Sequence, residues 1–237
     1  MPAPETPTEL FKQVQSLFET TSLGADKWYI LLTACLSASP DPELAADLYS
    51  YIITLPDYQT TAQRQVLIRR IRESLFKSAI LVGVPKPIEA ILAIAAVEQP
   101  ADRDYNTTRE TWQTGTENRQ RATEWFKRIY TRNAADTVGL FDAHKDFAWM
   151  SLEVTYGLFL SDRQVLGDVE SELVTLPAIM MQNLPNETHW HIRGTRRIGV
   201  AKGDVQMIWD AVTLVAGYFG IKLTKVPTVD EVEPGVL

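Results

Sequence analysis

The chain has 237 residues, of which 45% are hydrophobic and 22% charged, and its formal net charge is −7. This length holds one large domain or two small ones, and the acidic balance argues against a nucleic-acid-binding protein, which needs clustered Lys and Arg. One cysteine, Cys35, excludes an internal disulfide, and three histidines are too few for a dense His/Cys zinc site.

Targeting signals are not evident in the sequence. The first residues have neither the basic segment nor the apolar core of a signal peptide. The longest apolar stretch, 79–97, is interrupted by prolines, a lysine and a glutamate within 85–89, which makes it a poor membrane-span candidate. The end of the chain, Val236-Leu237, differs from a Ser-Lys-Leu peroxisomal signal. We therefore expect a cytoplasmic protein without a membrane partner.

In chain order, apolar residues recur at spacings of three and four, first over 10–18, then over 28–35 and 67–80. This spacing predicts amphipathic helices. Turns rich in Pro or Gly separate them at 39–43 and 83–87. We expect the start of the chain, 1–7, to be mobile.

The second part of the chain repeats this pattern. Residues 100–120 are polar and predict a loop before a helix near 117–133, and a proline turn follows at 183–187. The sequence at 199–204 ends one helix and offers Asp204 as the cap of the next. We expect 226–237 to be mobile. No segment alternates with the period of a strand, so the prediction is an all-α fold.

An internal repeat relates the two parts. Residues 28–48 and 172–192 align without gaps at an offset of 144, each as a helix, a proline-containing turn and a second helix. A unit that cannot bury its apolar face alone packs against another copy. We predict a first repeat at 8–98, an insertion with a helix at 99–139 and a second repeat at 140–225.

The second repeat resembles the carboxymuconolactone decarboxylase family, which includes the alkylhydroperoxidase D proteins. The matching residues are Tyr156-Gly157, Leu166-Gly167-Asp168, the segment 170–176, His191-Ile192-Arg193-Gly194, Gly199 and Asp204-Val205. The first repeat is similar more weakly, best over 71–85. The resemblance implies an alkylhydroperoxidase D-like helical fold, an activity without a cofactor, and assembly into trimers or hexamers.

The alkylhydroperoxidase branch carries a glutamate, a Cys-x-x-Cys twelve residues later and a histidine four residues after the second cysteine. The positions in this chain hold, in order, Glu172, Leu184, Glu187 and His191. In the first repeat they hold Trp28, Pro40, Glu43 and Asp47. Peroxide reduction needs a thiolate and a resolving thiol. The sequence therefore predicts that the chain is not a thiol peroxidase, and that only the second repeat keeps a proton-handling pair.

The expected catalytic residues are His191 and Glu172, with Glu187 one helical turn before the histidine. A carboxylate fixes the tautomer of a neighbouring imidazole, and such a pair can take a proton from a carbon next to a carbonyl and return it. This chemistry suits decarboxylation, isomerisation or dehydration of a small acidic or phenolic compound. The expected substrate-binding residues are Tyr156, Arg193 and Arg196. The decarboxylase branch has an acidic residue where this chain has Leu158.

Two alternatives to this enzyme stay open at this point. His191 can be a core histidine in a non-catalytic helical protein that kept the fold for binding or assembly. Glu172, Glu187 and His191 together can form a catalytic metal site, although the favoured reading has no metal. Contact between His191 and Glu172 beside an accessible cavity would favour the enzyme. The expected assembly is a homo-oligomer, with a trimer favoured over a dimer.

Overall fold

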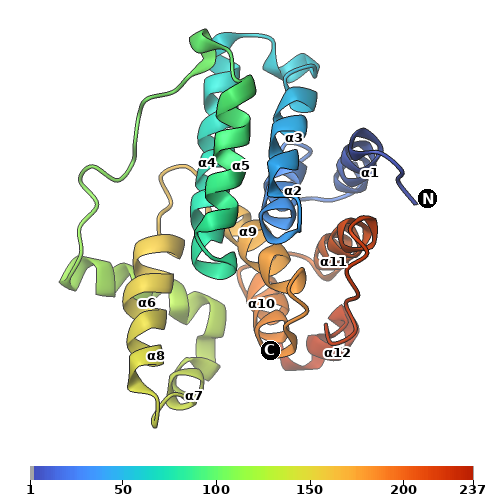
Figure 1. Ribbon diagram of the computed structural model, residues 1–237. Helices are drawn as coiled ribbons and strands as arrows, with labels where there is room; N and C mark the ends of the chain where they lie inside the picture. Colours follow the sequence, from blue (N-terminus) through green and yellow to red (C-terminus); the bar gives the residue numbers. More distant parts are fainter. Residues whose placement is uncertain (1–2, 237) are drawn as a thin grey trace.

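The computed structural model describes residues 3–236, and these form helices joined by loops, with no strand among them (Figure 1). The prediction of an all-α fold is confirmed. The α-helices are α1 (Pro7–Glu19), α2 (Trp28–Ala38), α3 (Ala45–Ile52), α4 (Thr61–Val82), α5 (Pro85–Val97), α6 (Thr116–Tyr130), α7 (Ala134–Gly139), α8 (Lys145–Trp149), α9 (Asp168–Met180), α10 (Pro185–Arg197), α11 (Lys202–Tyr218) and α12 (Val229–Val232). Short 3₁₀ turns are η1 (Pro42–Leu44), η2 (Pro56–Tyr58), η3 (Pro100–Asp102), η4 (Thr131–Asn133) and η6 (Glu233–Gly235), and η5 (Met150–Leu160) is a π-helix.

Local sequence signals explain where several helices begin and end. The Thr60 hydroxyl accepts from the backbone of Gln63, and the Gln63 side chain accepts from the backbone of Thr60, which is a capping box at the start of α4. Helix α4 ends at Gly83, whose φ of 90° disfavours other residues. Helices α5 and α10 each begin with proline, which leaves no unsatisfied amide at that position.

The two repeats pack against each other reciprocally. Helices α2 and α9, which the offset of 144 residues relates, contact each other directly. Helix α4 of the first repeat packs on α9 of the second, and the corresponding helix α11 of the second packs on α2 of the first. Helices of both predicted repeats contribute to one shared hydrophobic core.

The insertion lies to one side of this body, where a long loop from α5 leads into α6 (Figure 1). Helix α6 packs on η5 and on α10. Its apolar face, with Trp125, Phe126 and Ile129, forms a second hydrophobic cluster with Leu152 and Tyr156 of η5. The insertion thus covers the second repeat at the helices that carry the predicted catalytic residues.

Two predictions about local structure are wrong. The segment 226–236 is packed, not mobile: Val229 and Val232 are fully buried, and the Trp209 indole donates to the Pro227 carbonyl at 3.1 Å. Asp204 does not cap α11, because its carboxylate accepts from the Ser22 backbone amide at 3.1 Å and from the Ser22 hydroxyl. At the other end, Thr6 caps α1.

The remaining expectations for the two ends concern residues 1, 2 and 237, which lie outside the described residues. Within residues 3–236, no helix combines the length and the apolarity that a membrane crossing requires.

Candidate active site

His191 and Glu172 are in direct contact. The Nδ1 atom of His191 lies 2.9 Å from Oε2 of Glu172, across the interface of α10 and α9. Both side chains are buried, with 4% and 1% of their surface exposed. Because the carboxylate accepts from Nδ1–H, the contact fixes the tautomer that leaves Nε2 as the free base. His191 and Glu172, which the sequence predicts to be a pair, are therefore neighbours in the fold.

Two tyrosines continue the network from the other face of the imidazole. The Tyr156 hydroxyl lies 3.3 Å from His191 Nε2, and it donates to the Tyr130 hydroxyl at 3.0 Å. Tyr156 belongs to the π-helix η5. Such helices are rare in proteins, and those that occur are often found at functional sites. Tyr130 is the last residue of α6, and the next residue, Thr131, has a φ of 47°, an unfavourable backbone conformation for a β-branched residue.

Thr195 holds the pair from one turn further along α10. Its hydroxyl lies 3.2 Å from the same oxygen of Glu172 that contacts His191, and 2.7 Å from the His191 carbonyl. The other carboxylate oxygen, Oε1, is buried without a hydrogen-bond partner among the described residues. A buried carboxylate oxygen without a partner is unusual and marks a place where a donor is missing.

Burial sets the protonation state of the tyrosines. It raises the pKa of Tyr130 well above its usual range, and the charges of Glu172 and Glu187 add to this effect. Burial likewise raises the pKa of Tyr156. Both phenols therefore stay protonated at neutral pH and act as hydrogen-bond donors, not as bases.

The other predicted residues divide into two groups. Glu187 and Arg193 lie near the network, since the charge of each acts on Tyr130, and Arg193 Nε is buried without a partner. Arg196 is engaged elsewhere: its guanidinium forms two hydrogen bonds with the Glu233 carboxylate, at 2.9 and 2.8 Å, and anchors the C-terminal segment. The substrate-binding role of Arg196 stays a prediction, and in this conformation its guanidinium is paired with Glu233.

Access to the pair is closed within the chain. Five cavities in the described part of the chain have linings that include neither His191 nor Glu172. Tyr130 lies beside the imidazole, with ring centroids 6.3 Å apart, and Trp190 packs on Tyr130, with ring centroids 6.2 Å apart. Of the two features expected of an enzyme, the contact is present, and the pair is almost completely buried in this conformation.

The alternative of a catalytic metal site finds no matching arrangement of side chains in the described residues. Within residues 3–236, no group of three or more His, Cys, Asp and Glu side chains is arranged to hold a metal ion. Cys35 is fully buried, and burial raises the pKa of its thiol, as expected for a core residue and not for a nucleophile.

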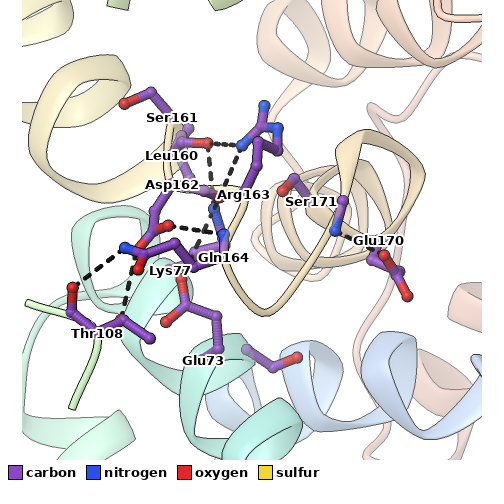
Figure 2. A network of polar contacts seen from close by, with 12 residues as sticks. Glu73, Lys77, Thr108, Leu160, Ser161, Asp162, Arg163, Gln164, Glu170 and Ser171 are labelled. Atoms are coloured by element: carbon purple, nitrogen blue, oxygen red, sulfur yellow. Dashed lines mark hydrogen bonds and ion pairs between the residues drawn. The ribbon is translucent and has the colours of Figure 1, made fainter. Parts of the chain in front are cut away.

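A second polar network lies behind the site, around the buried Lys77 of α4 (Figure 2). The Lys77 ammonium donates to the carbonyls of Leu160 and Asp162, at 3.1 and 2.8 Å, directly after the π-helix. Burial lowers its pKa to about 7. Glu73, one turn before Lys77, accepts two hydrogen bonds from Arg109. This network fixes the loop on which η5 ends.

Arg163 of the same loop connects the two networks. It donates from Nε to Asp168 of α9 at 2.5 Å, and its guanidinium lies 3.9 Å over the Trp125 ring. The charge of Glu172 acts on it, and its Nη2 atom is buried without a partner. Arg163 thus brings a positive charge close to the pair of His191 and Glu172.

Sequence reasoning missed Tyr130, Thr195 and Arg163. Thr195 had a detectable signal, because it lies four residues after His191 and so on the same helix face. Tyr130 belongs to the insertion, which has no counterpart in the first repeat to align with. Arg163 lies in a loop, where no periodicity predicts a contact.

Comparisons with known proteins give one distant relative. Peroxisomal protein 2 of Schizosaccharomyces pombe (strain 972) is 24% identical over 146 residues, which cover 57% of this chain and 63% of that protein. The chain therefore matches less than two thirds of the relative's length. No family model matches the chain, and no solved structure matches it.

Proposed function

We propose that the chain is a cofactor-independent acid/base enzyme acting on a small acidic or phenolic compound, similar in reaction type to a carboxymuconolactone decarboxylase. The observation that carries the proposal is the buried contact of 2.9 Å between His191 Nδ1 and Glu172 Oε2, with Tyr156 beside Nε2. A structural histidine needs one hydrogen-bond partner. A base held by a carboxylate and faced by a phenol that donates is the arrangement for moving a proton.

In this mechanism each group has a distinct task. His191 Nε2 takes the proton from a substrate carbon or hydroxyl, and Glu172 stabilises the imidazolium that forms. Tyr130 accepts the proton of Tyr156 and stays protonated because burial raises its pKa, so its own O–H donates to the oxygen on which negative charge develops. His191 then returns the proton to the carbanion or enolate. General acid/base help of this kind contributes about 10²–10⁴-fold to a rate.

The substrate class follows from the charges around the pair. Arg193 and Arg163 each have a buried nitrogen without a partner, and both act electrostatically on members of the network. A carboxylate or phenolate of the substrate would satisfy these donors. Admission requires Tyr130 and Trp190 to move, because the pair is closed in this conformation. Helix α6 is then the cover of the site.

The resemblance to the decarboxylase family adds support from a different direction. It predicted the glutamate and the histidine from sequence alone, and these two residues are in contact. The shared core of the two predicted repeats suits a chain in which one molecule takes the part of two family subunits. Leu184 and Glu187 occupy the positions of the two cysteines, so the proposed reaction is not a thiol-dependent peroxide reduction.

The experiment is a turnover assay with a panel of small lactones, carboxylic acids and phenols, read by proton NMR. We expect one compound to be converted by the wild type and not by His191→Ala, with the folded state of the variant checked by circular dichroism. His189→Ala, on the same helix, is the control and should keep the activity. Conversion by His191→Ala at the wild-type rate would contradict the proposed site.

A second candidate function is a non-catalytic binding or assembly module, which the closed access to His191 favours. The first repeat has no acid/base pair, since Trp28 and Asp47 occupy the two positions. This candidate predicts that no compound in the panel is converted, while the variants at His191 lose stability or assembly instead. The same set of variants therefore separates the two functions.

For the location, the sequence favours the cytoplasm, whereas the printed name of the relative favours the peroxisome. A fluorescent fusion imaged with a peroxisomal marker decides between them. Diffuse fluorescence supports the first location and punctate overlap the second.

A further inference from the structure

The position equivalent to the catalytic glutamate is occupied differently in the first repeat. The offset of 144 residues places Trp28 in the register of Glu172 and Tyr51 in the register of Thr195. Glu172 and Thr195 are in contact, and the rings of Trp28 and Tyr51 are also in contact, with centroids 6.1 Å apart. The repeat relation therefore holds at this site, with an aromatic pair in place of a polar one.

A cavity of about 550 Å³ is lined by Trp28, one member of this aromatic pair. Its lining comes from the end of α1, the start of α2 and the segment that leads into α4: Gln15, Ala25, Asp26, Trp28, Leu55, Asp57, Tyr58, Gln63 and Val66. Trp28 is nearly buried and forms the floor, while Asp57 is exposed at the rim. A volume of this size fits a small organic molecule.

The charged side chains that line the cavity are all negative. It contains two carboxylates, Asp26 and Asp57, and no cationic side chain. Lys27 and Arg70 both approach Asp26, at 3.2 and 3.7 Å. Asp57 is next to Tyr58, whose pKa is raised by burial and, to a smaller extent, by the charges of Asp26 and Asp57. A carboxylate beside a partly exposed aromatic ring remains available to a ligand.

We propose that this cavity binds a small organic ammonium ion with an apolar body, independently of the acid/base site. The Tyr58 ring and the Trp28 floor offer aromatic surface, and Asp57 offers the opposite charge, which together are the elements of ammonium recognition. Ala25, Leu55 and Val66 receive the apolar part. The repeat that lost its acid/base pair thus keeps a binding function at the equivalent place.

The test is isothermal titration calorimetry of the full-length chain with benzyltrimethylammonium chloride. Benzyl alcohol and benzoate are the neutral and anionic comparison compounds. We expect saturable binding of the cation and affinities at least about tenfold weaker for the other two, since they lack the cation–aromatic and charge contacts. Asp57→Asn and Tyr58→Leu should each lower the affinity for the cation by about fivefold or more.

Three control variants make the result specific. Tyr58→Phe keeps the ring and should keep the affinity, and Asp47→Asn removes an exposed carboxylate of the same repeat outside the cavity. His191→Ala should also leave ammonium binding unchanged, which separates this proposal from the acid/base function. Equal affinity for all three compounds, an unchanged affinity in Asp57→Asn, or no saturable binding of the cation would overturn the proposal.

Discussion

The imidazole of His191 and the carboxylate of Glu172 are removed from water almost completely, and such groups are tolerated only when they are paired. Each therefore depends on the other. The pairing also orients the imidazole, because Nδ1 is bonded to Glu172 and Nε2 faces Tyr156. The same contact that orients the base is expected to contribute to the stability of the chain.

This dependence gives a prediction for Glu172. Glu172→Ala leaves the Nδ1–H of the buried histidine without its partner and should lower the free energy of unfolding by about 1–3 kcal/mol. Glu172→Gln should lower it less, because the amide oxygen still accepts from Nδ1–H. Urea denaturation measures both values. Equal losses for the two variants would show that the contact does not orient the histidine.

Lys77 gives a prediction about pH. Its pKa is lowered to about 7 by burial, whereas in the unfolded chain a lysine titrates near about 10.4. Between these values the unfolded state binds more protons, so this residue makes stability rise with pH from about 7 towards 10. In Lys77→Met that rise should be absent. Melting temperatures from pH 6 to 9.5 test it, and parallel profiles of the two proteins would contradict it.

At the scale of elements, helix α6 approaches η5 and α10 closely because glycines leave room for it. A Cβ atom at Gly157 would lie 2.4 Å from the Asn118 side chain, and one at Gly194 would lie 2.6 Å from Ile129. These two glycines permit the contact that brings Tyr130 to Tyr156. Helix α6 can therefore cover the site because positions 157 and 194 have no side chain.

Gly194→Ala should displace α6 and lower the free energy of unfolding by about 1–3 kcal/mol, as overpacking does. Gly203→Ala is the matched control, because it lies in α11 with nothing within 4 Å of the added atom. That change should be neutral or stabilising, by up to about 1 kcal/mol from helix propensity. Thermal unfolding compares the two, and a neutral Gly194→Ala would mean that α6 does not press on α10.

The helices themselves were predictable from the periodicity of apolar residues, and so were the Pro and Gly turns between them. The contact of His191 with Glu172 was predictable from the family pattern. The widening of Met150–Leu160 into a π-helix was not, because its residues have the spacing of an ordinary helix. Tyr130 was not either, because the packing of an insertion depends on tertiary contacts. The same contacts order 226–236, whose composition is typical of a mobile end.

At the scale of the molecule, the two predicted repeats share one hydrophobic core. Two exposed apolar surfaces remain. One is the stripe of Val84, Ile88 and Leu92 on α5, and the other includes Phe147 and Trp149 around α8. Exposed apolar patches of this kind mark contact surfaces. They agree with the expectation of a homo-oligomer.

We predict a trimer, with a mass near 80 kDa for three chains of 26.7 kDa. Multi-angle light scattering at micromolar concentration measures it. Ile88→Lys with Leu92→Glu should shift the mass towards a single chain, while Val66→Lys, on an exposed position of α4, should leave it unchanged. A wild-type mass of 26.7 kDa would contradict the assembly and weaken the family resemblance.

The measurement that tests the central claim most directly is proton exchange from solvent. The wild type, Glu172→Gln, His191→Ala and His189→Ala are each incubated with a pool of small carboxylic acids and phenols in D₂O, and deuterium incorporation is read by mass spectrometry. A His191–Glu172 base predicts that one compound gains carbon-bound deuterium with the wild type and with His189→Ala, and not with the other two variants. Exchange that persists in His191→Ala, or no exchange in any sample, would contradict the account.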